Sequence, residues 1–142
     1  PFGLGNQKDK VYDRDVVDWW HKALENATIL CRDFEHVVKK YAYAGSFIFM
    51  DPPYRGSFTQ YNTDFHDGEQ TRVLDCLRHC KDVGAAAWVS NRDTGDEFFE
   101  DQWAGDIKYF DVTYTAGRRK KTEDGFEAKA AREVLLTTQG EC

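Results

Sequence analysis

The sequence predicts an α/β fold built on a mostly parallel sheet with a carboxy-terminal antiparallel hairpin. Two observations support this prediction. Segments of strand length alternate with segments of helical periodicity along most of the chain. The run over residues 47–50 is continuously apolar, which is typical of a strand buried on both faces of a parallel sheet. The last two strand segments have no helix between them, so we expect them to pair antiparallel.

The first half of the chain is expected to form two helices and two strands. Residues 13–25 carry an apolar stripe at helical spacing, and an Asp near the start can cap the helix. The apolar run over 27–31 predicts a short buried strand. A second helix is expected over 33–41, and the strand over 47–50 follows it.

The second half is expected to repeat this alternation. Residues 68–82 form a strongly amphipathic segment that a glycine ends, so we expect a helix there with Val73, Leu74, Leu77 and Cys80 inward. The remaining elements are a loop over 55–68, a buried strand over 85–90, a short helix over 96–103, a strand over 107–114, a charged loop over 118–130 and a last strand over 133–138.

The composition fits one compact domain. Of the 142 residues, 41% are hydrophobic and 15% aromatic, which supports a real core and excludes a disordered chain. The net charge of −6 speaks against nucleic-acid binding by bulk charge alone. No apolar run approaches the ~20 residues that a membrane span needs, and no signal peptide is recognisable. We expect a cytoplasmic protein of prokaryotic or phage origin that does not bind membranes.

The four cysteines favour reduced thiols over a metal site. They are Cys31, Cys76, Cys80 and Cys142, and none forms a C-x-x-C pair. Cys76 and Cys80 share a helix face near two histidines, His79 and His66. This spacing fits no common zinc pattern, so we expect no metal.

The tetrapeptide Asp51-Pro52-Pro53-Tyr54 is the motif that carries chemistry. It follows a predicted buried strand directly, and ligands in open α/β sheets bind outside the carboxyl ends of strands. The Asp51 carboxylate and the Pro52 carbonyl can accept the two hydrogens of an exocyclic amino group, and Tyr54 offers a face on which a base stacks. The alternative interpretation of the tetrapeptide is a proline-rich turn that only ends a strand.

The chemistry of base amino groups explains why a motif with two acceptors is useful. The lone pair of a base's exocyclic amine is delocalised into the ring, which makes the nitrogen a poor nucleophile. Two acceptors on its hydrogens draw the nitrogen toward tetrahedral geometry, and methyl transfer from a sulfonium then requires mainly alignment. The base must leave the duplex to reach such a pocket.

With this motif in place, the chain resembles the Dam-type, alpha-group DNA adenine-N6 methyltransferases over roughly residues 13 to 138. The resemblance rests on four segments in order: CRDFEHVV over 31–38, FIFMDPPYRGSFTQYNTDF over 47–65, WVSNRDT over 88–94, and YTAGRRKK over 114–121 followed by EVLLTT over 133–138. It implies part of a Rossmann-like methyltransferase sheet, S-adenosylmethionine as cofactor and DNA as partner.

The resemblance also implies roles for individual residues. Asp51, Pro52, Pro53 and Tyr54 would be catalytic, with Asp51 also near the methionine end of the cofactor. Asp33 and Phe34 would contact the cofactor's adenine. The candidate DNA contacts are Asn91, Arg118, Arg119 and Lys120.

Simpler readings of several of these residues stay open. Asp33 can be a helix cap, and the basic cluster over 118–120 can be a solvated loop. Ser90 and Asn91 can shape the wall of the site. Tyr61 and Phe65 can form a lid or simply pack.

An amino-terminal half of such an enzyme is missing by the same resemblance. We interpret residues 1–12 as the tail of a target-recognition region and residues 13–142 as the carboxy-terminal part of the catalytic domain, in a longer reading frame. The strand over 47–50 then has an unpaired edge. We expect an upstream segment, a second copy of the chain or residues 27–31 to close it, and we expect this part alone to bind cofactor weakly.

The leading functional hypothesis is site-specific adenine-N6 methylation of DNA by an enzyme of which this is a part. One alternative is an inactive DNA-binding or partner-dependent half-methyltransferase module. Another is a methyltransferase acting on RNA or on another amine. The sequence leaves open the recognition site, the oligomeric state, and the choice among restriction-modification, repair marking and phage self-protection.

Overall fold

The computed structural model describes residues 13–56, 65–114, 120–122, 125–127 and 129–139. The chain divides into two compact units, residues 1–32 and residues 33–142, which are described separately. The domain boundary expected after residue 12 falls where the described residues begin, so it stays a prediction. None of the described helices has the length and apolar character that crossing a membrane requires.

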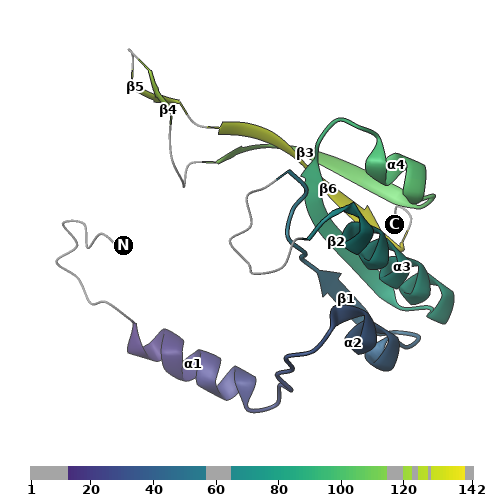
Figure 1. Cartoon of the computed structure of the whole chain (residues 1–142). Helices are drawn as coiled ribbons and strands as arrows, with labels where there is room; N and C mark the ends of the chain where they lie inside the picture. The colour runs from purple at the N-terminus through teal and green to yellow at the C-terminus, as the bar shows by residue number, and fades with distance from the viewer. Residues whose placement is uncertain (1–12, 57–64, 115–119, 123–124, 128, 140–142) are drawn as a thin grey trace. The chain divides into compact units, whose positions relative to one another are not determined.

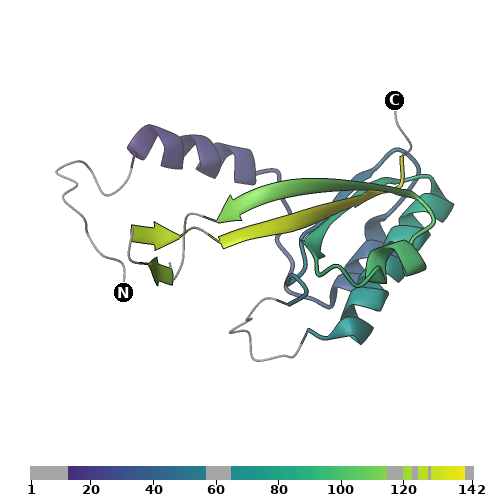
Figure 2. The same cartoon turned by 90° about the horizontal axis from the view of Figure 1, so that it is seen from above.

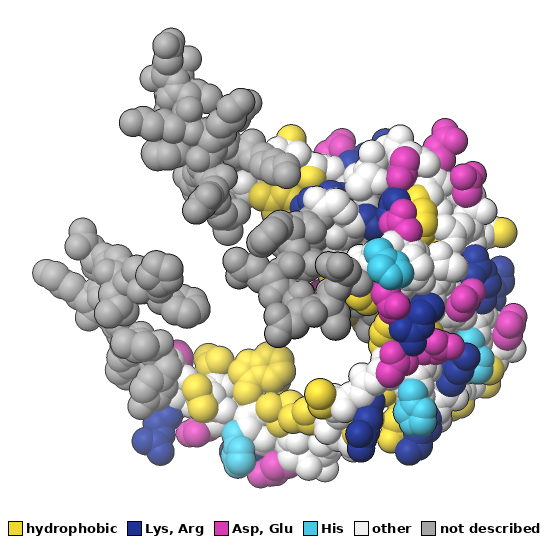
Figure 3. Space-filling model, viewed as in Figure 1, with side chains coloured by type: hydrophobic (Ala, Val, Ile, Leu, Met, Phe, Trp, Pro, Cys, Tyr) yellow, Lys and Arg dark blue, Asp and Glu magenta, His cyan; other side chains and the backbone are white. Residues whose placement is uncertain are grey.

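The first unit contains the helix α1 (Arg14–Leu24), as predicted. Asp13 caps it by accepting hydrogen bonds from the backbone amides of Asp15 and Val16. The helix buries none of its residues, and its apolar side chains gather on one surface (Figure 3). α1 is therefore an amphipathic helix whose apolar stripe is not buried by the described residues.

The strand predicted over residues 27–31 is wrong. These residues have no regular structure, and the side chain of Ile29 is 81% exposed. A strand needs a neighbour for its backbone N–H and C=O groups. No described strand pairs with this segment, so its apolar residues alone do not make it one.

The second unit is built on a four-stranded sheet in the order β1-β2-β6-β3 (Figure 1). β1 (Phe47–Met50) is parallel to β2 (Ala86–Asp93), and β6 (Lys129–Thr137) is antiparallel to both β2 and β3 (Asp106–Tyr114). β1, β2 and β3 therefore run in one direction, and only β6 is reversed. This confirms the predicted mostly parallel sheet with its antiparallel hairpin of β3 and β6, whose long ribbons run side by side in Figure 2.

The charged segment over 118–130 differs from the expected loop. It contains two short strands, β4 (Lys120–Thr122) and β5 (Gly125–Glu127), which pair antiparallel in a sheet of their own. β3 and β6 are already antiparallel neighbours, so a hairpin is the local structure that joins them with backbone pairing.

Three helices belong to the second unit: α2 (Phe34–Tyr41), α3 (Asp67–Val83) and α4 (Phe98–Gln102). α3 begins after His66, whose Nδ1 accepts from the Gly68 amide, and it ends at Gly84, whose φ of 78° favours glycine. The core lies between α3 and one face of the sheet. It includes all four α3 residues predicted to point inward, namely Val73, Leu74, Leu77 and Cys80.

The cysteine side chains agree with reduced thiols. Cys76 and Cys80 are both buried on α3 and form no disulfide. Burial raises the pKa of the Cys76 thiol to about 12 and raises that of Cys80 as well, because a thiolate is costly in an apolar setting. Within the described residues, no cluster of three or more His, Cys, Asp or Glu side chains is arranged to hold a metal.

The opposite face of the sheet is open. The strand register places Phe47, Phe49, Trp88 and Phe110 on it, and all four rings are exposed. Phe47 and Phe49 are 58% and 56% exposed, so the prediction of a strand buried on both faces is wrong for β1. The helices of this unit cover only one side of the sheet, and no described strand pairs with the outer edge of β1.

Candidate active site

The Asp51-Pro52-Pro53-Tyr54 turn begins where β1 ends. β1 and β2 are parallel, with Met50 paired to Val89, so Asp51 emerges beside Ser90 of β2. The prolines end the strand because neither can donate a backbone hydrogen bond. The turn thus occupies the edge of the sheet where the sequence predicted it.

Ser90 contacts two side chains of the turn. Its hydroxyl donates to Oδ1 of Asp51 at 2.6 Å. Burial raises the pKa of Tyr54, and a hydrogen bond with Ser90 acts in the opposite direction. One hydroxyl therefore contacts both the carboxylate and the phenol of the motif. No described donor contacts the second carboxylate oxygen, Oδ2.

Asn91 holds the turn from the buried side of the sheet. Its Oδ1 accepts from the backbone amides of Arg55 at 2.9 Å and Arg92 at 2.8 Å, and its Nδ2 donates to Oε1 of Gln70 at 2.9 Å. Nε2 of Gln70 in turn donates to the Pro53 carbonyl at 2.7 Å. Gln70 and Asn91 are 1% and 0% exposed.

This burial does not support the contact with DNA that was expected of Asn91. Residues alternate between the two faces of a strand, and Asn91 faces the core while Ser90 faces outward. Its amide oxygen and nitrogen are both bonded to protein groups. The bonds of Asn91 therefore agree with the alternative reading, a residue that shapes the wall of the site, and its contact with DNA stays a prediction.

The two proline carbonyls differ in their partners. The Pro53 carbonyl accepts from Gln70, whereas no described donor contacts the Pro52 carbonyl. Among the described residues, the Pro52 carbonyl and Oδ2 of Asp51 are therefore acceptors of the turn without a protein donor.

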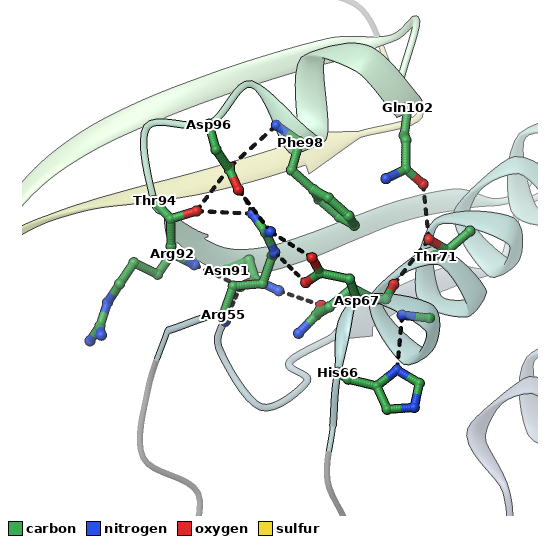
Figure 4. A network of polar contacts seen from close by, with 12 residues as sticks. Arg55, His66, Asp67, Thr71, Asn91, Arg92, Thr94, Asp96, Phe98 and Gln102 are labelled. Carbon is green, nitrogen blue, oxygen red and sulfur yellow. Dashed lines mark hydrogen bonds and ion pairs between the residues drawn. The ribbon is translucent and has the colours of Figure 1, made fainter.

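Arg55, the residue that follows the turn, binds two distant segments of the chain and forms what we call the Arg55 clamp (Figure 4). Its guanidinium donates to both carboxylate oxygens of Asp67 at 2.8 and 2.9 Å and to both of Asp96 at the same distances. It also donates to Thr94 Oγ1 and lies 3.9 Å from the centre of the Phe98 ring. The side chain is only 9% exposed.

The charges within this clamp reinforce one another. Hydrogen bonds to Asp96 and Asp67 raise the pKa of Arg55 above its ordinary value. The same bonds lower the pKa of Asp67 and of Asp96. Sequence reasoning missed the clamp because residues 55–68 looked like a polar loop. The available signal was an Arg directly after the motif, with Asp residues at the starts of two later helices.

Asp33 and Phe34 lie at the start of α2. Asp33 caps this helix by accepting from the amides of Glu35 and His36, which confirms the simpler reading left open for it. Both of its carboxylate oxygens also accept from Arg72, at 3.0 and 2.8 Å, and this hydrogen bonding lowers the pKa of Asp33. A contact between Asp33 and a cofactor stays a prediction.

Phe34 lies next to Phe65, which lines a pocket beside the Arg55 clamp. The Arg72 guanidinium lies 4.7 Å from its ring centre, and the Phe65 ring lies 6.1 Å away. Phe65 also lines a pocket of about 630 Å³ that Arg55 and Asp67 border. Phe65 thus packs against Phe34, and Tyr61, its proposed companion in a lid, lies outside the described residues.

The predicted basic cluster stays untested. Arg118 and Arg119 lie outside the described residues, and Lys120 begins β4. A contact of this cluster with DNA phosphates is therefore still an expectation.

Comparison with known proteins identifies the family. The family model of the D12 class N6 adenine-specific DNA methyltransferases matches residues 1–129. The type II methyltransferase M.MjaIII of Methanocaldococcus jannaschii is 38% identical over 104 residues, which cover 69% of this chain and 35% of that protein. The retron Ec67 DNA adenine methylase of Escherichia coli is 24% identical over 139 residues, covering 97% and 46%.

A third relative extends this picture. The type II methyltransferase M1.LlaDCHI of Lactococcus lactis is 26% identical over 150 aligned residues, covering 99% of this chain and 49% of that protein. The chain thus spans about a third to a half of the length of these relatives. The family model covers most of the chain and includes the turn at the end of β1. This protein belongs to the D12 class of N6 adenine-specific DNA methyltransferases.

Proposed function

We propose that this chain is the adenine-holding part of an enzyme that transfers a methyl group from S-adenosylmethionine to N6 of adenine in DNA. One observation carries the proposal. At the end of β1, the Asp51 carboxylate is oriented by Ser90 and the Pro52 carbonyl has no described donor, beside a Tyr ring. These groups match the two hydrogens and the flat face of adenine.

The proposed mechanism uses the turn to prepare the amine. A flipped adenine stacks on Tyr54, and its N6 hydrogens meet the Asp51 carboxylate and the Pro52 carbonyl. Two acceptors localise the nitrogen lone pair. Bound S-adenosylmethionine supplies the methyl group from its sulfonium. After transfer, Asp51 is the group placed to receive the surplus proton from N6.

The start of α2 fits the adenine end of that cofactor. Asp33 is half exposed, and its Oδ2 accepts only from Arg72 among the described donors. This oxygen has capacity for an adenine amino group, and the Phe34 ring offers an apolar face beside it. We propose these two residues, with Asp51 nearer the methionine end, as the contribution of this chain to the cofactor site.

The open sheet face favours a partner in the complete enzyme. Four aromatic rings on it are exposed, and the edge of β1 has no described neighbour. A contiguous apolar face of this kind marks an interaction surface. We propose that the half absent from this chain, relative to its longer relatives, covers the face. A second copy of the chain is the alternative occupant.

Methylation assays and calorimetry test the proposal together. S-adenosylmethionine is titrated into the chain alone and into the chain mixed with the amino-terminal half of the M. jannaschii relative. Transfer of labelled methyl groups to duplex DNA is then measured, with DNA premethylated at adenine N6 as the substrate control. We expect binding and transfer from the mixture and little from the chain alone.

Two carboxylate substitutions sharpen this experiment. Asp51→Asn keeps the shape of the side chain but weakens its acceptor, and we expect it to lower transfer at least 100-fold. Asp75→Asn changes an exposed carboxylate on α3 and is expected to leave transfer unchanged. Equal transfer by both variants would contradict the role of the turn.

A partner-dependent module without catalytic activity is the second candidate. The open face and the uncovered stripe of α1 favour it, because both indicate missing packing partners. DNA binding by the mixture without any methyl transfer, at saturating cofactor, would support this candidate over the first.

A further inference from the structure

Gln70 and Asn91 are polar side chains placed in the hydrophobic core. Gln70 lies on α3 among Val73, Leu74 and Leu77, and Asn91 lies on β2. Burying an amide without partners costs several kcal/mol. Here each of the four amide heteroatoms makes at least one hydrogen bond to a protein group.

The hydrogen bonds of this pair converge on the two peptide groups that flank Tyr54. Gln70 donates to the carbonyl of Pro53, which precedes Tyr54, and Asn91 accepts from the amide of Arg55, which follows it. The bond between the two side chains closes the bridge at 2.9 Å. An apolar pair of similar volume would fill the core but would leave both backbone groups unpaired.

The bridge holds one of the two proline carbonyls of the turn. Gln70 donates to the Pro53 carbonyl, whereas no described donor contacts the neighbouring Pro52 carbonyl. Holding the peptides on both sides of Tyr54 also fixes the direction in which its side chain leaves the backbone. Ser90, the neighbour of Asn91, contacts Asp51 on the opposite face of the strand. β2 therefore holds the turn from both of its faces.

We propose that Gln70 is a positioning residue for methyl transfer, acting through Asn91 and the Pro53 carbonyl on the Tyr54 ring and the Pro52 acceptor. The inference rests on the proposed function and deepens it. Misplacing a reacting group by about 1 Å costs roughly 100-fold in rate. Loss of the bridge is thus expected to lower kcat more than it changes KM for S-adenosylmethionine, because Asp33 and Phe34 lie at the start of α2, outside the bridge.

The test compares substitutions on one helix in the methylating mixture described above. Gln70→Met keeps the length of the side chain and removes both hydrogen bonds, and we expect a 10- to 100-fold lower kcat. Thr71→Val is the matched control. It removes the contacts of the adjacent hydroxyl with Gln102 and with the Asp67 carbonyl, neither of which belongs to the turn. The kcat of this variant is therefore expected to stay within twofold of wild type.

A third variant separates positioning from simple stability. In Gln70→Glu the acid donates to the Pro53 carbonyl only when protonated, and burial raises the pKa of a carboxyl group. We expect its kcat to rise relative to wild type as the pH falls from 8 to 6, whereas the ratio for Gln70→Met stays flat. This variant also serves if Gln70→Met does not fold.

Hydrogen exchange gives a second readout that does not depend on activity. The Arg55 amide, measured by exchange and NMR, is expected to lose protection in Asn91→Leu and to keep it in Thr71→Val. Folded Gln70→Met with a wild-type kcat, or a flat pH ratio for Gln70→Glu, would overturn the proposal. Wild-type protein that transfers no methyl group would instead contradict the proposed function, and the role of Gln70 in transfer would fall with it, while exchange would still report on the turn.

Discussion

The Arg55 clamp gives a stability prediction that can be worked out from its contacts. Arg55→Met removes the two bidentate ion pairs and the stacking on Phe98 while keeping most of the apolar stem. The partner carboxylates of Asp67 and Asp96 are 63% and 50% exposed, so solvent screens each pair. At about 0.5 to 1 kcal/mol for each pair and a similar amount for the cation–π contact, we expect a loss of about 2 kcal/mol.

Urea unfolding of the chain at pH 7, followed by tryptophan fluorescence, measures this loss. The matched control is Arg78→Met on α3, because Arg78 pairs with one carboxylate, that of Asp75, and is more exposed. We expect the control to lose less than about 1 kcal/mol. Equal midpoints for wild type and Arg55→Met, or an equal loss in both variants, would refute the argument that two converging carboxylates make Arg55 special.

Three further predictions concern pH, the hydroxyl beside the motif and the open face. Arg55 lowers the pKa of Asp67 and Asp96, so the stability that these two carboxylates contribute is complete above about pH 4 and is lost as the pH falls further. The urea midpoint should therefore fall less steeply between pH 5 and pH 2.5 in Arg55→Met than in wild type. Parallel slopes of midpoint against pH would contradict this. Ser90→Ala is expected to lower the methylation rate about 10-fold, which corresponds to roughly one hydrogen bond to a charged group. Ser90→Thr keeps the hydroxyl and is expected to keep most of the rate. Equal losses in both variants would rule out the bond to Asp51 as the cause. Phe49→Ser removes an exposed ring and should weaken association with the amino-terminal half about 10-fold by calorimetry without lowering the stability of the chain alone, and unchanged affinity would exclude this face as the contact.

Local patterns allowed much of the fold to be predicted. α1 and α3 lie within one or two residues of their predicted bounds because helical periodicity, an acidic or polar cap and a terminal glycine are all encoded within a short segment. The strand preceding the Asp51 turn was predicted for a similar reason, since two prolines end it wherever it lies. The antiparallel hairpin followed from the absence of a helix between two strand segments.

The candidate site was predictable only where a single motif carries it. The four residues of the turn are contiguous, so their placement at the end of a strand follows from the sequence. The side chains that hold the turn come from α3 and β2, 17 and 36 residues further along the chain. Asn91 looked like a surface residue because nothing nearby in the sequence shows that β2 turns it toward Gln70.

The sequence by itself thus determined the helices, the turn after β1 and the motifs of the family resemblance, because each is encoded in neighbouring residues. The tertiary structure decided three things that depend on distant partners. Residues 27–31 are apolar yet form no strand, because no described strand pairs with them. Phe47 and Phe49 are exposed, because the helices of the second unit cover only one face of its sheet. Arg55 is buried, because carboxylates 12 and 41 residues away converge on it. Burial and pairing are properties of the assembled chain, and a local pattern records only the capacity for them.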